Sequence, residues 1–180
     1  MPPLNAAPRY SAAQRRLHWL MFLLVALAYL CIELRGSFER GSWPRATVVQ
    51  SHYWIGLAVL ALALPRLLLR LRRGAPPITP PLPAWQAWPS RAVHGALYAF
   101  LLAQPLLGLL TAWTDGKSVL VPFTARVVPA LVAPDPAWAA RLEDLHGSLG
   151  SAFYWVIGLH VLASLYHHAI RGDDTLRRMR

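Results

Sequence analysis

The segment from Asp144 to Arg171 constrains this chain most, because it is long, almost wholly apolar, and carries four histidines. It reads DLHGSLGSAFYWVIGLHVLASLYHHAIR. A span of that length and polarity predicts a transmembrane helix. Ionisable side chains inside such a helix are costly and indicate function. The alternative for any one histidine is a polar packing group bonded to a carbonyl, so partners on other helices decide between the two interpretations.

Composition places the chain in the membrane. Hydrophobic residues make up 56% of its 180 residues, which predicts a membrane protein in a lipid bilayer and not a soluble domain. The net charge of +10 would suit nucleic acid, but the basic residues cluster at the ends of apolar runs, so we expect no nucleic-acid partner. The single cysteine, Cys31, allows no intrachain disulfide and favours no cysteine-based metal site.

Four apolar runs separated by glycine- and proline-rich breakers predict four helices, at about 12–34, 46–71, 89–113 and 138–170. Ser11 is suited to cap the first. The segment GAPPITPPLP predicts an extended linker. The segment from Thr114 to Trp138 is apolar yet broken by prolines, so we expect a surface cap on the bundle that could include one short interfacial helix. The predicted fold class is all-α, an integral membrane four-helix bundle in a single domain, 1–180.

Arginine and lysine predict the orientation of the bundle. Most of them lie in the N-terminal segment, the second-to-third connection and the C-terminal tail, and the positive-inside rule then puts both termini in the cytoplasm. The opposite side carries fewer, diluted by acids: Arg35, Arg40, Arg45, Lys117, Arg126 and Arg141.

Depth along the predicted helices pairs the histidines. His52 and His146 both lie near the outer ends of their helices, whereas His18 lies 17 positions before Arg35 and His160 lies 16 positions after Asp144. At 1.5 Å per residue, both of the latter are about 25 Å from the outer surface. His94 and His167 form a third layer at the cytoplasmic interface, with His168 beside them.

Facing histidines inside a four-helix bundle are a common container for haem, and bis-imidazole ligation is a common haem arrangement. Zinc is the rival, but it prefers four protein ligands, or three and a water, and no acid or cysteine lies at either depth. Gly56, Gly147, Gly150 and Gly158 near the histidines would let a flat macrocycle approach the backbone, or serve ordinary helix packing.

Three segments carry a resemblance to a known family: RLHWLMFLLVALAYLCIELRG, SHYWIGLAVLALALPRLLLRL, and HGSLGSAFYWVIGLHVLASLYHHAIRGDDTLRRM. In this order they resemble the bacterial cytochrome b561 family, over nearly the whole chain. The resemblance implies an inner-membrane four-helix protein with two b haems. It assigns His18 with His160 to the inner haem iron and His52 with His146 to the outer one, which is the pairing that depth gives. The outer cap, 114–138, departs from the family pattern.

The members that look most similar are superoxide oxidases, so the resemblance implies an enzyme, a superoxide:ubiquinone oxidoreductase. It would oxidise superoxide to O2 on the periplasmic side and pass electrons through both haems to ubiquinone near the cytoplasm. Arg35, Arg40, Lys117 and Arg126 are candidates for steering the anion, or belong to solvated loops. His94 and His167 lie at the depth for a quinone site; the alternatives are that they extend towards lipid headgroups or bond haem propionates. Arg66, Arg70 and Arg91 could pair with propionates or simply mark the membrane interface.

Two other functions stay open. The chain could be a b-type electron-conduit subunit for a hydrogenase- or dehydrogenase-like partner, with the same haem layout and no substrate chemistry of its own. It could also be a non-redox membrane protein whose histidines serve transport or packing.

Overall fold

The computed structural model describes residues 9–180, so the first eight residues of the predicted domain lie outside it. Four long helices follow in order: α1 (Ala12–Leu34), α2 (Trp43–Arg73), α3 (Ala84–Thr114) and α4 (Pro136–Ala169), with two short 3-10 turns, η1 (Arg35–Ser37) and η2 (Arg177–Met179). Each α-helix is long and apolar enough to cross a membrane. The all-α, four-helix membrane fold predicted from the sequence is confirmed.

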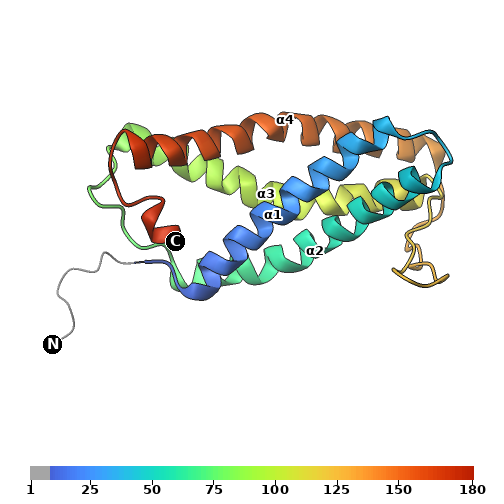
Figure 1. Cartoon of the computed structure of the whole chain (residues 1–180), viewed down its shortest axis with the longest axis horizontal. Coiled ribbons are helices and arrows are strands. Elements are labelled where there is room, and N and C mark those ends of the chain that lie inside the picture. Colours follow the sequence, from blue (N-terminus) through green and yellow to red (C-terminus); the bar gives the residue numbers. More distant parts are fainter. Residues whose placement is uncertain (1–8) are drawn as a thin grey trace.

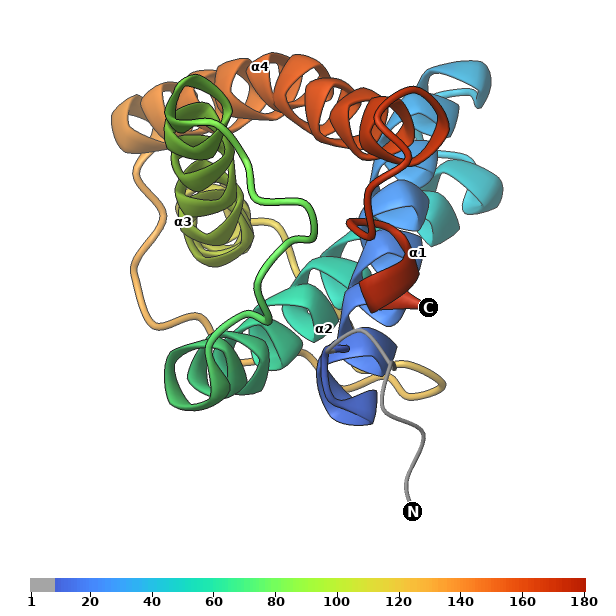
Figure 2. The same ribbon diagram turned by 90° about the vertical axis from the view of Figure 1, so that its left-hand side faces the viewer.

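The four helices run along the long axis of the molecule and surround a common centre when seen from the end (Figures 1 and 2). The C-terminus, the start of α1 and the α2–α3 connection lie together at one end of the bundle, and the α1–α2 and α3–α4 connections lie at the other. Successive helices are packed as neighbours. α1 and α4 are also joined by two hydrogen bonds, from Tyr29 Oη to the Gly150 carbonyl (2.8 Å) and from Tyr154 Oη to Glu33 (2.7 Å).

The core is thin, as expected where lipid covers the outer faces of the helices. Met21 of α1 packs with Val59 and Ala63 of α2, and all three are buried. Between α3 and α4, the rings of Phe100 and Phe153 stack at 4.0 Å. Large apolar side chains elsewhere are exposed, including Trp155 at 83%. In a bilayer such a surface contacts hydrocarbon at no cost, so little of the apolar area needs to be buried inside the protein.

Helix starts follow local chemistry. Ser11 caps α1 in a capping box with Gln14, as the sequence predicts. α3 begins five residues earlier than predicted, at Ala84, because Pro89 lies inside the helix and does not start it. As the sixth residue of α3, Pro89 removes one hydrogen bond from the second turn without ending the helix. Pro65 likewise lies within a continuous α2.

The outer cap contains no helix between residues 115 and 135, so the expectation of a short interfacial helix there is wrong. It forms instead a loop in which an isolated antiparallel β-bridge joins Leu120 to Val127. Gln50 bonds both Ser118 and Leu120, and Trp54 donates to the Leu120 carbonyl, so α2 holds the first part of the loop. The rest projects away from the bundle, with Phe123 fully exposed at a positive φ of 60°.

Candidate cofactor site

The outer histidine pair joins α2 to α4. The ring centroids of His52 and His146 are 6.3 Å apart, with the ring planes at 87°. Each Nδ1 lies against a backbone carbonyl, that of Ala28 for His52 (2.9 Å) and that of Gln104 for His146 (3.1 Å). A carbonyl can only accept, so both Nδ1 atoms carry the proton and both Nε2 lone pairs are free to bind a metal.

The inner pair joins α1 to α4 with the same spacing. His18 and His160 have ring centroids 6.3 Å apart and planes at 76°. Two rings bound to one metal from opposite sides need about this distance. A metal–nitrogen bond is about 2 Å and a ring nitrogen lies roughly 1.2 Å from its centroid, so the centroids should stand roughly 6 Å apart. Both pairs therefore fit a metal gripped between two imidazoles.

Gln104 and Gly108 of α3 shape the outer pair, and the sequence analysis missed both. Gln104 Nε2 donates to the His146 carbonyl (2.8 Å) while the Gln104 carbonyl faces the His146 ring. A Cβ at Gly108 would lie 2.9 Å from His146 Cε1. The glycine therefore leaves room for the imidazole. In the sequence, the only indication of a polar role there is the adjacent pair Gln104 and Pro105 in the middle of an apolar run.

The predicted glycines have other surroundings. A Cβ at Gly56, Gly147 or Gly158 would meet nothing within 4 Å, so space is open beside them. Gly150 instead packs against Gln104, where a Cβ would approach Nε2 to 3.1 Å. Gly150 therefore serves close helix packing, while open space remains next to the glycines at 56 and 147.

Arg66 of α2 contacts the inner pair, and Arg70 follows it on the same helix. Arg66 Nη2 lies 3.1 Å from His18 Nδ1, and its guanidinium lies 5.8 Å from the Tyr98 ring centroid. A guanidinium only donates, so metal binding through His18 Nε2, which keeps a proton on Nδ1, would require Arg66 to turn to another acceptor. One turn further on, the buried Arg70 Nη1 has no partner among the described residues. An anionic group such as a haem propionate would supply both acceptors.

The predicted cytoplasmic layer divides in two. His94 of α3 lies against the inner pair, with its ring centroid 5.3 Å from that of His160 and its Nδ1 bonded to the Ser90 carbonyl (2.6 Å). His167 instead bonds Asp173, with 2.5 Å between Nδ1 and Oδ2. Among the described residues, no hydrogen bond or ring contact joins His94 to His167. Asp173 was not among the residues predicted from the sequence, although it closely follows the adjacent His167 and His168.

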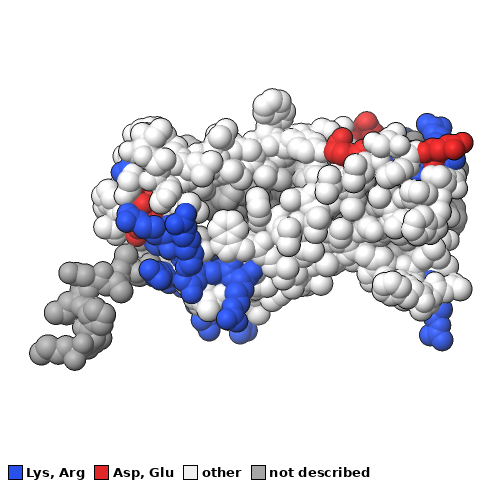
Figure 3. Space-filling view, in the orientation of Figure 1, with Lys and Arg blue, Asp and Glu red and all other residues white. Residues whose placement is uncertain are grey.

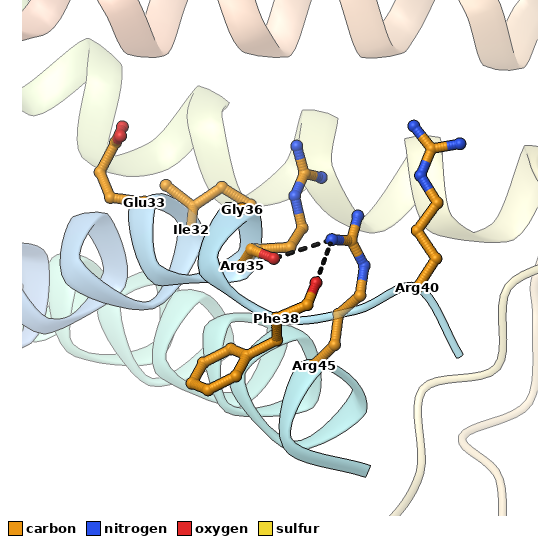
Figure 4. A pocket seen from close by; sticks show the side chains of 7 residues that line it. All are labelled: Ile32, Glu33, Arg35, Gly36, Phe38, Arg40 and Arg45. Carbon is orange, nitrogen blue, oxygen red and sulfur yellow. Dashed lines mark hydrogen bonds between the residues drawn. The ribbon is translucent and has the colours of Figure 1, made fainter. Parts of the chain in front are cut away.

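Basic side chains surround two cavities at the opposite end of the bundle. The larger, about 550 Å³, is lined by Arg35, Arg40 and Arg45 together with Glu33, and Arg45 donates to the carbonyls of Arg35 and Phe38 (Figure 4). The second, about 330 Å³, shares two of these arginines and reaches Tyr53, the neighbour of His52. Its lining is Arg35, Arg45, Val49, Gln50, Tyr53, Lys117 and Ser118.

Lys117 is less available than the arginines. It forms an ion pair with Asp115, and this hydrogen bond raises the pKa of Lys117. Arg126 stands apart, in the projecting loop. Of the four predicted steering residues, Arg35 and Arg40 are therefore the ones that line the larger cavity without a carboxylate partner among the described residues.

Four apolar helices with two interhelical histidine pairs, each spaced to fit a metal between two imidazoles, define the class as an all-α membrane protein suited to a metal cofactor. Sequence comparison agrees. The family model of prokaryotic cytochrome b561 matches residues 9–180. The chain is 37% identical to "Cytochrome b561 homolog 1" of Escherichia coli over 171 residues, 95% of this chain and 96% of that protein.

Two further relatives span most of the chain. "Probable superoxide oxidase CybB" of Yersinia pestis is 34% identical over 95% of both chains. "Cytochrome b561 homolog 2" of Escherichia coli is 31% identical over 97% of this chain and 93% of that protein. This chain belongs to the prokaryotic cytochrome b561 family. It is a b-type haem protein of electron transport and a multi-pass protein of the bacterial inner membrane.

Proposed function

We propose that this chain is a di-haem superoxide oxidase, which oxidises superoxide to O2 on the periplasmic side and reduces ubiquinone near the cytoplasm. The observation that carries the proposal is the repetition of one geometry at two depths, with both histidine pairs spanning two helices at a centroid distance of 6.3 Å. Two iron porphyrins held at these two depths would carry electrons across the bilayer. The relative named as a probable superoxide oxidase supports the choice of donor.

In this proposal the histidines position the haem irons. His52 and His146 would hold one iron and His18 and His160 the other, each through Nε2. The carbonyls behind His52 and His146 fix their tautomer and ring orientation, and such partners of a ligand also raise its basicity. Haem b, when bound, supplies one-electron redox chemistry. Arg66 and Arg70 are suited to hold propionates, because each has donor groups without a carboxylate partner in the described chain.

The basic cavities support superoxide as the donor. Like-signed charge around a cleft attracts an anion and raises its association rate. Arg35 and Arg45 line both cavities, and the second cavity reaches Tyr53, directly beside a proposed iron ligand. These side chains would therefore concentrate superoxide close to the outer haem, and association should slow as salt screens them.

The proposed orientation puts both termini in the cytoplasm. Lysine and arginine gather at the end of the bundle with the termini, whereas acids are prominent at the other end (Figure 3). The positive-inside rule then places the outer histidine pair and the basic cavities on the periplasmic side.

A stopped-flow experiment on the purified, haem-loaded protein tests the function. Superoxide should reduce the haem, seen as a shift of the Soret band, and added ubiquinone should reoxidise it. Haem that stays oxidised under a superoxide flux would contradict the proposal. Copurification with a soluble redox partner would then favour the electron-conduit function.

A further inference from the structure

The turn after α4 folds a carboxylate back beneath the last turn of that helix. Gly172 has a φ of +65°, a left-handed conformation that glycine adopts without strain, and it reverses the chain. The Asp173 N–H then donates to the His167 carbonyl (3.1 Å), and Asp173 Oδ2 lies 2.5 Å from His167 Nδ1. His167 is thus held by Asp173 through both backbone and side chain.

Asp173 is built into the fold as a charged group. It is completely buried, and its second oxygen accepts a hydrogen bond from the Thr175 N–H (3.0 Å). Arg171 Nε lies 3.4 Å from Oδ2, and Arg177 donates to the Asp173 carbonyl. Burial alone would raise the pKa of Asp173, but the hydrogen bonds from His167 and Thr175 outweigh it and the pKa lies below its usual value. Asp173 therefore remains a carboxylate at neutral pH.

A carboxylate bonded to Nδ1 determines what the rest of the imidazole can do. The bond keeps a proton on Nδ1, so Nε2 is the nitrogen left to exchange protons with a ligand. The negative charge also balances the positive ring when both nitrogens are protonated. A histidine oriented by a carboxylate in this way is a common arrangement for general acid–base catalysis.

We propose that Asp173 is a positioning residue that holds His167 with Nε2 free to give a proton to the ubiquinone oxygen. This rests on the proposed function. Two superoxide anions give two O2 and two electrons, and ubiquinone takes two electrons and two protons to form ubiquinol. His167 Nε2 gives one of these protons and regains it from cytoplasmic water, which also supplies the second.

The experiment compares two oxidants on the full-length, haem-loaded protein after reduction. Ubiquinone-1 must take up protons, whereas ferricyanide takes only an electron. Asp173→Asn should slow reoxidation by ubiquinone-1 at least about tenfold, within the range of general acid–base effects, and leave reoxidation by ferricyanide within twofold of wild type. His167→Gln should act in the same way, and the double variant should be no slower than His167→Gln.

Asp174→Asn is the matched control. Asp174 is the next residue and is also buried, but it bonds the Thr79 N–H and Arg178 and does not contact His167. Its ratio of ubiquinone to ferricyanide rates should equal that of wild type. If Asp173→Asn does not accumulate with haem, Asp173→Glu carries the test, because it keeps the charge and should hold the ratio within threefold of wild type.

The outcomes separate the two proposals. Wild-type protein that ubiquinone-1 cannot reoxidise would overturn the proposed function itself. Wild-type reoxidation that Asp173→Asn leaves unchanged, or an equal loss with both oxidants, would overturn the role of Asp173 alone. A tenfold fall in the ratio for Asp173→Glu would also overturn it.

Discussion

At the scale of single residues, the backbone carbonyls that accept hydrogen bonds from His52 and His146 determine how the two imidazoles are oriented. They fix the protonated nitrogen and leave Nε2 for the proposed iron. The inner pair has no such support for His18, whose Nδ1 faces Arg66. The two proposed haem sites therefore differ in their surroundings although their histidines stand equally far apart.

Removing one histidine from each pair should separate the two sites. His52→Ala should lose the outer haem, and His160→Ala the inner one, because one imidazole cannot replace two opposed ligands. Haem content per chain, measured by pyridine haemochrome, should fall by about half in each variant. Full occupancy in either variant would show that the pairing is wrong.

Gly108→Ala should disturb the outer pair without touching a ligand. The new Cβ would meet His146 Cε1 at 2.9 Å, so the imidazole must move. We expect the outer haem to be lost or its low-spin spectrum to change, by optical and electron paramagnetic resonance spectroscopy. Gly95→Ala is the control on the same helix, since a Cβ there meets nothing within 4 Å; equal spectra for Gly108→Ala and wild type would refute the steric argument.

The histidine pairing could be predicted from the sequence because depth along a membrane helix is nearly linear in residue number. Gly108 and Gln104 could not, because their role depends on the rotation of α3 about its axis, which hydrophobic periodicity does not define when lipid surrounds the helix. Asp173 was missed for another reason. Its contact with His167 needs the chain reversal at Gly172, a feature of local backbone and not of the helix pattern.

At the scale of elements, the helices and the extended linker between α2 and α3 were predictable, and the outer cap was not. α1 begins and ends where predicted, because Ser11 caps it and η1 with its glycine follows it. α3 begins earlier than predicted because Pro89 lies in its second turn and does not mark its start. The conformation of the 115–135 loop depends on hydrogen bonds from Gln50 and Trp54. These residues are distant from the loop in the sequence, so its conformation could not be predicted from local pattern.

The turn after α4 should make stability depend on pH at the acid end. The pKa of Asp173 is lowered from 3.8 on folding, so its stabilising contribution is complete well above pH 3.8 and is lost as the pH falls through the folded-state pKa. At neutral pH, Asp173→Asn should cost about 2 kcal/mol, the scale of a hydrogen bond to a charged group. Helix content during thermal unfolding gives the comparison.

The difference in stability between wild type and Asp173→Asn should stay constant at moderate pH and shrink below pH 3.8. A difference that does not change down to the lowest pH at which both variants fold would mean that Asp173 contributes nothing through its charge.

At the scale of the whole molecule, the length of the bundle separates the two proposed sites. The basic cavities and the outer histidine pair lie towards one end, while the inner pair and the His167–Asp173 contact lie towards the other. A donor and an acceptor in different compartments would thus never need to meet. Both features could be predicted from the sequence. Hydropathy predicts the number of helices, and the positions of the histidines along them predict the separation of the two pairs.

The orientation can be measured directly. If the C-terminus lies in the cytoplasm as proposed, green fluorescent protein fused after Arg180 should fluoresce in bacterial cells, and alkaline phosphatase fused at the same place should be inactive. A fusion of either reporter within the 115–135 loop should give the reverse result. Active phosphatase at the C-terminus would invert the assignment of donor and acceptor sides.

The count of haem groups in the purified wild-type protein tests the central claim most directly. A pyridine haemochrome assay set against the protein concentration should find two b haems per chain, one for each histidine pair. One haem per chain, or none, would contradict the account.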